Sequence, residues 1–141
     1  MFYMDASFVV SALTEDEVSS QMSRDWLRAN PEAPLLVSQW VDTEVRRAIS
    51  QKIRTGEISL EQRAALLTQW KNFKDASTLN VEIESDDFET ASRFVEHYSL
   101  SLRASDALHV AIAYGAGCTL VTLDKRMAEA AVELGIQVAE V

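Results

Sequence analysis

Four acidic residues stand where carboxylates could do chemistry. Asp5 and Asp124 each come at the end of a short apolar segment, and Glu44 lies at the border of an apolar helical stripe. Asp106 stands among small and apolar residues in a predicted helix. Oxygen ligands of this kind, without a cluster of Cys or His, suit Mg²⁺ or Mn²⁺ rather than a structural zinc. Carboxylates that are brought together repel each other, and a divalent cation relieves that repulsion.

Hydrolysis of a phosphodiester is the reaction that gains most from carboxylate-bound Mg²⁺ or Mn²⁺. One ion can lower the pKa of an attacking water, and another can neutralise charge on the leaving oxygen. A structural explanation also stays open for each acid. Asp5 and Asp124 could cap the helices that follow them, and Asp106 could be favoured by the dipole of its helix. Glu44 could pair with an arginine one turn away.

The carboxylates need a scaffold, and the sequence predicts alternating strands and helices. Apolar runs predict strands at 1–4, 35–37, 79–83, 119–123 and 136–141. Apolar periodicity predicts helices over 7–13, 17–29, 38–54, 59–73, 86–95 and 103–114, and a last helix closed by Gly135. The expected caps are Ser7, Ser38, Ser59 and Asp86. In the helix over 86–95, we expect Phe88, Ala91, Phe94 and Val95 to face inward.

This alternation predicts an α/β fold, a three-layer α/β/α sandwich around a central, mostly parallel sheet. The 141 residues fit a single domain over 1–141. Ligands collect beyond the carboxyl ends of parallel strands, which is where Asp5 and Asp124 are expected.

The composition limits the classes of protein that fit. The net charge is −9, from 13 Lys and Arg against 22 Asp and Glu, which argues against binding nucleic acid through a broad basic field. Cys118 is the only cysteine, so no intramolecular disulfide is possible, and its apolar setting favours buried packing over a catalytic thiol. No segment is long enough to span a membrane, and the first residues do not resemble a signal peptide. We expect a cytoplasmic protein.

Four segments carry a resemblance to a known family. They are MDAS at 4–7, VDTEVRRA at 41–48, RASDALHVA at 103–111 and LVTLDKR at 120–126. The segment around Asp106, followed about a dozen residues later by Thr122-Leu123-Asp124, is the most specific of them. Over nearly its whole length the chain resembles PIN-domain ribonucleases, and among these the VapC-type toxins of bacterial toxin–antitoxin pairs.

The resemblance implies a PIN-like fold with an acidic quartet that binds Mg²⁺ or Mn²⁺: Asp5, Glu44, Asp106 and Asp124. Ser7 and Thr122 would support the quartet by hydrogen bonds, and Arg103 would pair with Asp106 or contact a substrate phosphate. The implied activity is that of an endoribonuclease, the toxin of a type II pair. The implied partners are RNA, a second copy of the chain in a homodimer, and a VapB-type antitoxin whose tail covers the active site.

An acidic RNA-cleaving enzyme has to reach phosphates through local cations. The candidates for RNA binding are Arg46, Arg47, Lys52, Arg54, Lys125 and Arg126. The run over 46–54 could instead be a solvated helix face, and Arg46 or Arg47 could be the partner of Glu44. Contact with the RNA backbone is the favoured interpretation, because phosphate contacts dominate such affinity.

Several other residues have two interpretations. His109 could be a general base, but a packed or orienting histidine is favoured, and His97 is expected at the surface. The aromatic residues before the third strand are expected to pack in the core, while partly exposed ones would anchor the antitoxin; they are Trp26, Trp40, Trp70 and Phe73.

Two other functions compete with the nuclease. The alternative is a PIN-like module that binds RNA or protein without cleaving. A phosphotransfer domain of the aspartyl type is disfavoured, because Asp5-Ala6-Ser7 lacks a second acid and no lysine stands at the end of the last strand.

Overall fold

The computed structural model describes residues 1–15 and 18–141. Within these residues a parallel sheet has the strand order β3-β2-β1-β4. Its strands are β1 (Phe2–Met4), β2 (Leu35–Val37), β3 (Thr78–Asn80) and β4 (Thr119–Val121). Parallel neighbours need crossover connections, and helices provide them here.

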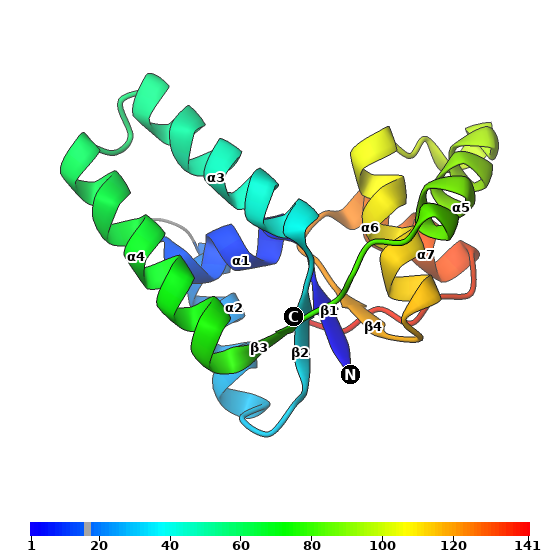
Figure 1. Ribbon diagram of the computed structural model, residues 1–141, viewed down its shortest axis with the longest axis horizontal. Helices are drawn as coiled ribbons and strands as arrows, with labels where there is room; N and C mark the ends of the chain where they lie inside the picture. The colour runs from blue at the N-terminus through cyan, green and yellow to red at the C-terminus, as the bar shows by residue number, and fades with distance from the viewer. Residues whose placement is uncertain (16–17) are drawn as a thin grey trace.

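The helices lie on both sides of this sheet (Figure 1). On one side are α1 (Ala6–Leu13), α2 (Val18–Ala29), α3 (Gln39–Arg54) and α4 (Leu60–Ser77). On the other are α5 (Ser85–Glu96), α6 (Ala104–Gly115) and α7 (Lys125–Glu133), with a 3₁₀ turn at Tyr98–Leu100. The predicted three-layer α/β/α fold is confirmed.

The centre of the sheet is apolar and buried on both faces, as parallel strands between helices require. Tyr3 of β1 lies opposite Leu36 of β2 and Leu120 of β4, and all three are buried. This register aligns the carboxyl ends of the strands. The backbone N–H of Asp5 donates to the carbonyl of Val121 over 3.1 Å, so the residues after β1 and β4 lie side by side.

Core packing accounts for two of the tryptophans. Trp70 is fully buried, and the half-buried Trp26 packs edge-on against Phe2 and Phe8. Trp40 is also half-buried and lies at an apolar pocket beside α5 and α6. The prediction that these rings pack in the core is therefore confirmed for Trp70 and Trp26.

Some local predictions are wrong. The cap of α1 is Asp5 rather than Ser7, and the cap of α5 is Glu84 rather than Asp86, because Glu84 forms a reciprocal capping box with Asp87. The segment 136–141 forms a single bridge, from Val138 to Leu120, instead of a strand.

Two further differences concern the edges of elements. β3 covers Thr78–Asn80, so the predicted strand over 79–83 begins and ends too late. Residue 17, where the second helix was expected to begin, lies outside the described residues, and α2 is described from Val18.

The inward face of α5 differs from its prediction. Phe88 and Val95 are 55% and 40% exposed, whereas Ala91 and Thr90 are buried. Small residues let α5 approach α6 closely: a Cβ on Gly115 would lie 2.8 Å from Oδ1 of Asp87. Phe88 and Val95 of α5 are left partly on the surface.

Cys118 is buried, as predicted, and its Sγ lies 3.4 Å from the carbonyl oxygen of Ala116. Burial raises the pKa of its thiol, which disfavours the nucleophilic thiolate. Among the described residues, no helix has the length and apolar character to cross a membrane.

Candidate active site

Asp5 stands at the carboxyl end of the central strand β1 and is only 2% exposed. Ser7 Oγ lies 2.8 and 2.9 Å from its two carboxylate oxygens. Thr122 Oγ1 donates to Oδ2 over 2.9 Å, and the backbone N–H of Phe8 donates to Oδ1 over 3.0 Å. Burial raises the pKa of Asp5, while the imidazole of His109 and these hydrogen bonds oppose the rise. The carboxylate is therefore held in one orientation and surrounded mainly by neutral donors.

Ser7 and Thr122 also join the end of β4 to the first turn of α1. The backbone N–H of Leu123 donates to Ser7 Oγ, and that of Asp124 donates to Thr122 Oγ1, each over 3.0 Å. Ser7 Oγ and Thr122 Oγ1 lie 3.3 Å apart. The hydrogen bonds expected of these two hydroxyls are present.

Asp124 caps α7, because its Oδ1 accepts the backbone N–H of Met127 over 3.0 Å. Capping is thus confirmed for Asp124, as it is for Asp5. Capping does not use all the acceptor positions of a carboxylate, which has two oxygens and about four lone-pair directions. A role in binding a cation stays a prediction for both.

Asp106 is half-buried in the first turn of α6. Burial and the nearby charge of Asp124 raise its pKa, whereas the backbone N–H of Arg103, His109 and the Arg103 guanidinium lower it. The fold therefore brings Asp106, from the third crossover, close enough to Asp124 for the two charges to repel each other. Arg103 is exposed and acts on Asp106 through its charge.

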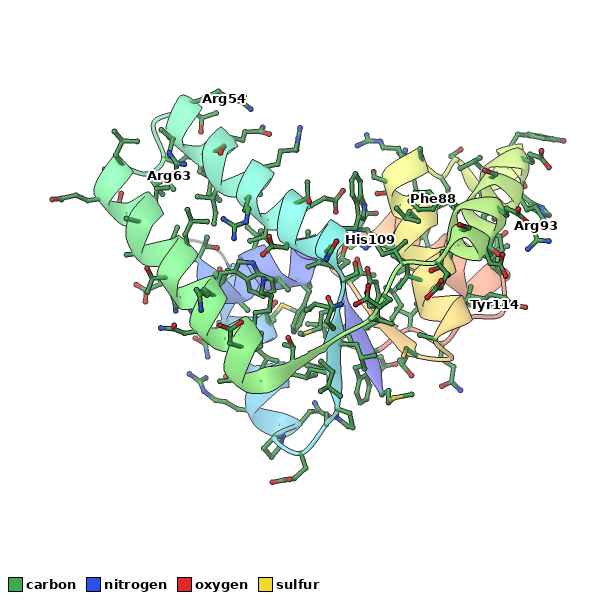
Figure 2. All side chains as sticks on the ribbon, viewed as in Figure 1. Arg54, Arg63, Phe88, Arg93, His109 and Tyr114 are labelled. Atoms are coloured by element: carbon green, nitrogen blue, oxygen red, sulfur yellow. The ribbon has the colours of Figure 1, made fainter. Side chains whose placement is uncertain are left out.

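Glu44 of α3 pairs with His109 of α6, not with an arginine of its own helix. Glu44 Oε2 lies 2.6 Å from His109 Nε2. His109 is 1% exposed and also contacts Tyr3 through Nδ1, at 3.0 Å. Figure 2 shows His109 between the two groups of helices, near the start of α3. The prediction that His109 is packed in the interior is confirmed, and an orienting role stays a prediction. The partner of Glu44 is this histidine and not an arginine of α3, and His97 is exposed as expected.

The predicted RNA-binding cations of α3 are spread along the helix. Arg46 donates to Asp42 over 2.7 Å, and Lys52 to Glu57 over 2.8 Å. Arg54 lies at the far end of α3, away from His109 (Figure 2). Arg47 is exposed and lines a cleft beside the carboxylates.

That cleft has a volume of about 580 Å³. Residues of the candidate metal site and candidate RNA-binding cations both line it; they include Ser7, Glu44, Arg47, Lys52 and Asp124. Lys125 and Arg126 follow Asp124 in the first turn of α7 and are exposed. Cations at a helix N-terminus interact unfavourably with the helix dipole, so the charges of Lys125 and Arg126 do not stabilise α7.

The donor set suits a hard divalent ion in its chemistry, since Asp5, Glu44, Asp106 and Asp124 offer only oxygen. The repulsion between Asp106 and Asp124 is of the kind that such an ion relieves. With the side chains as they stand, no group of three or more His, Cys, Asp or Glu among residues 1–15 and 18–141 is arranged to hold an ion. It is the chemistry of these oxygen donors, and not their present arrangement, that fits a hard divalent ion.

Sequence reasoning missed three contributors to this edge of the sheet. Tyr3 and Ser38 contact each other, and Tyr3 contacts His109. The available signal was a tyrosine in a buried strand, whose hydroxyl needs a partner. Asp42 was also missed; it binds Arg46, Lys74 and Trp70. In the sequence, the only indication of this role was that Arg46 follows Asp42 by four residues in a predicted helix, a spacing that favours an ion pair.

A parallel sheet between two layers of helices, with acidic residues after its central strands, defines a three-layer α/β protein whose acids gather at one edge of the sheet. The PIN domain family matches residues 2–133, so the chain belongs to that family. A search of curated proteins found no match.

Several solved structures have a similar fold. VapC20 from Mycobacterium tuberculosis, described as a sarcin-ricin loop cleaving toxin, has a TM-score of 0.73 at 15% identity, covering 92% of this chain and 95% of VapC20. FitAcB from Neisseria gonorrhoeae has a TM-score of 0.72 at 14% identity, covering 99% and 97%. VapBC2 from Rickettsia felis, bound to a DNA fragment from their promoter, has a TM-score of 0.67 at 16% identity, covering 99% and 98%. At these identities the similarity establishes the fold.

Proposed function

We propose that residues 1–141 form one nuclease domain, a metal-dependent endoribonuclease that acts as the toxin of a type II toxin–antitoxin pair. The observation that carries this proposal is Asp5. Its buried carboxylate lies at the carboxyl end of the central strand and is oriented by Ser7, Thr122 and the backbone of Phe8. Such a carboxylate is costly to bury without a counter-charge. Membership of the PIN domain family supports the same activity.

Four carboxylates would hold Mg²⁺ or Mn²⁺: Asp5, Glu44, Asp106 and Asp124. The ion supplies a bound water of lowered pKa and positive charge beside the phosphate. Ser7 and Thr122 keep the carboxylate of Asp5 in one orientation, which spares the cost of ordering it when substrate binds. Their hydrogen bonds also favour its charged form, against the burial that raises its pKa.

Arg47 would bind the RNA backbone beside this site, because it is exposed and lines the same cleft as Glu44 and Asp124. Lys125 and Arg126, which follow Asp124 in the first turn of α7, are the next candidates for contact with the RNA backbone. The ion pairs of Arg46 with Asp42 and of Lys52 with Glu57 compete with phosphate, so we assign these two cations a smaller share. Arg54 would contact RNA only where the substrate extends along α3.

A VapB-type antitoxin would bind among the helices on the α1–α4 side. A cleft of about 210 Å³ there is lined by Leu13, Ile58 and Leu66. Val18 of α2 and Leu60 of α4 are exposed apolar residues on the same side of the sheet. The VapBC2 and FitAcB structures share this fold, which favours a partner of the same kind.

A homodimer would use the other side of the sheet. An apolar pocket of about 480 Å³ is lined by Trp40, Phe88, Val95 and Leu108 among others. The exposed Phe88 and Val95 would be covered by a second copy of the chain. Light scattering of the wild type and Phe88→Glu measures this: we expect a dimer that the substitution converts to monomer, and a wild-type monomer would contradict it.

The activity is tested by incubating the purified protein with structured RNAs and Mg²⁺ or Mn²⁺. We expect cleavage by the wild type that a chelator abolishes and that is lost in Asp106→Asn and Asp5→Asn. Asp86→Asn is the matched control, because Asp86 is an exposed acid of α5. This variant should cleave RNA as the wild type does. Equal cleavage by Asp106→Asn, or a wild type that cleaves no RNA, would favour the alternative of a module that binds RNA or protein without cleaving.

A further inference from the structure

A chain of buried hydrogen bonds runs from the middle of the sheet to Glu44. Ser38 Oγ lies 2.8 Å from the hydroxyl of Tyr3, and that hydroxyl lies 3.0 Å from His109 Nδ1. His109 Nε2 lies 2.6 Å from Glu44 Oε2. Tyr3, Ser38 and His109 are each at most 1% exposed. Polar groups buried to this extent must satisfy one another.

The partners give this chain a direction. Ser38 caps α3, so its Oγ accepts the backbone N–H of Val41, which leaves the Ser38 proton to donate to Tyr3. With the Ser38 proton directed at its oxygen, the Tyr3 hydroxyl can donate its own proton to His109 Nδ1. An imidazole that accepts at Nδ1 carries its proton on Nε2, where it donates to Glu44. In the opposite tautomer, a lone pair on Nε2 would face the carboxylate at 2.6 Å.

Burial of Tyr3 agrees with this direction. Its side chain is fully buried and its hydroxyl contacts Ser38 and His109, so an ionised phenolate would be costly there. The hydroxyl therefore keeps its proton and stays a donor.

We propose that His109 is a positioning residue for Glu44: Tyr3 and Ser38 hold its imidazole with the Nε2 proton directed at Glu44 Oε2, which leaves Oε1 as the oxygen available to a divalent cation. This inference rests on the proposed function of the site. It assigns to the buried strand β1 two separate contributions, Asp5 at its end and Tyr3 two residues earlier. His109 does not act on substrate, because it is buried and both of its ring nitrogens are engaged.

The bond matters because Glu44 and His109 come from opposite sides of the sheet. Glu44 belongs to α3 and His109 to α6 (Figure 1). A glutamate has three rotatable side-chain bonds, and fixing them costs conformational entropy when an ion binds. Hydrogen bonds to the ligands of a metal keep that cost low, and removing such a partner typically weakens metal binding by about 10–100-fold.

The tautomer of His109 is the first test. The chain has two histidines, and the exposed His97 serves as an internal reference. In ¹⁵N spectra of the metal-free wild type at neutral pH, we expect His109 to carry a proton on Nε2 and none on Nδ1. Tyr3→Phe should shift the Nδ1 resonance of His109, because Nδ1 loses its hydrogen-bond donor, and leave His97 unchanged. A proton on Nδ1 in the wild type, or an unchanged His109 spectrum in Tyr3→Phe, would overturn the proposed chain.

The second test asks whether His109 acts through Glu44. Calorimetric titration with Mn²⁺ is done on the wild type, His109→Leu, Glu44→Ala and the double variant. We expect His109→Leu to weaken Mn²⁺ binding by roughly tenfold or more, and to have no further effect once Glu44 is alanine. His109→Gln should recover part of the loss, because its amide can donate to Oε2. An equal loss in the Glu44→Ala background, or no loss in the wild type, would overturn the positioning role.

Tyr3→Phe keeps the experiment decisive if His109→Leu does not fold. It removes only one hydroxyl and should weaken Mn²⁺ binding in the same direction, again only where Glu44 is present; no change would count against the proposal. RNA cleavage that is lost in Asp106→Asn but unchanged in His109→Leu would overturn the positioning role and leave the proposed function standing. A wild type that neither binds Mn²⁺ nor cleaves RNA would overturn both.

Discussion

The carboxylates at the carboxyl edge of the sheet fall into two groups, Asp42 by itself and Asp5 with Asp106. The two groups differ in the charge of the residues around them. Asp42 accepts hydrogen bonds from Arg46 at 2.7 Å, Lys74 at 3.0 Å and Trp70 at 2.8 Å. Asp5 receives only neutral donors in its direct hydrogen bonds, and Asp106 has the like charge of Asp124 nearby.

The pKa values show the difference. Burial alone would raise the pKa of Asp42, but its hydrogen bonds from Arg46, Lys74 and Trp70 lower it below the ordinary value. Burial raises the pKa of Asp5 and of Asp106. The chain thus neutralises the half-buried Asp42 with hydrogen bonds from its own cations. At Asp5 and Asp106, burial outweighs the opposing effects of His109 and Arg103, and the pKa stays raised. We infer that the positive charge for the second group comes from outside the chain.

Cleavage of RNA should give the largest contrast between the two groups. We expect Asp5→Asn to lower the cleavage rate roughly a hundredfold or more, at least as much as losing an outer partner of a metal ligand costs. Asp42→Asn should cleave within a few-fold of wild type, measured at a temperature where both are folded. A larger loss in Asp42→Asn than in Asp5→Asn would reverse the assignment of the two groups.

Stability without metal should change in opposite directions. Asp42→Asn removes the charged acceptor of Lys74 and weakens the bond to the buried Trp70, and should lower the free energy of unfolding by about 1–3 kcal/mol. Asp106→Asn removes a carboxylate that is repelled by Asp124, and should raise it. Denaturant unfolding in the presence of a chelator measures both values. A loss of stability in Asp106→Asn would show that its charge is already compensated within the protein.

The pH dependence of stability should also have opposite signs. The pKa of Asp106 lies above its ordinary 3.8 in the folded protein, so the folded state takes up a proton first as the pH falls. Its contribution to stability therefore increases as the pH falls through the raised pKa toward 3.8. The pKa of Asp42 lies below 3.8, so its contribution is present above 3.8 and is lost as the pH falls through the lowered pKa.

Unfolding of the chelator-treated protein at a series of pH values checks these signs. Asp106→Asn should remove part of the stability that the wild type gains as the pH falls toward 3.8. Asp42→Asn should remove part of the stability that the wild type loses as the pH falls below 3.8. A profile that Asp106→Asn leaves unchanged would contradict a raised pKa at that residue.

Two neighbouring arginines give the smallest contrast. Arg47 lines the cleft beside Glu44, whereas Arg46 is held by Asp42. We expect Arg47→Ala to weaken RNA binding and to reduce the salt dependence of binding by about one phosphate contact, with less effect from Arg46→Ala. Binding of RNA to the uncleaving Asp106→Asn background at several salt concentrations measures this. Equal effects would mean that RNA displaces Asp42 from Arg46.

The fold and the strand-end acids were predictable because they depend on local sequence. A short apolar run ending at Asp5 or at Thr122-Leu123-Asp124 carries both the strand and the polar residue that follows it. The acid of α3 was placed on the correct helix border for a similar reason, from the spacing of Val41, Val45 and Ile49.

The partners of the acids were not predictable, because they come from distant segments. Asp42 binds Trp70, which is 28 residues away, and Glu44 binds His109, which is 65 residues away. Local spacing instead suggested an arginine of α3 as the partner of Glu44. The exposure of Phe88 was also missed, because which face of α5 is buried depends on how α5 packs against α6, a distant segment of the chain.

Binding of Mn²⁺ measured by calorimetry tests the central claim most directly, with wild type, Asp106→Asn and Asp42→Asn compared under one set of conditions. The claim is that the unneutralised carboxylates at the ends of β1 and β4 and the start of α6 take up a divalent cation, and that Asp42 does not. We predict that wild type and Asp42→Asn bind Mn²⁺ with similar affinity and that Asp106→Asn loses most of the binding. Undiminished binding in Asp106→Asn, or binding lost in Asp42→Asn, would contradict the claim.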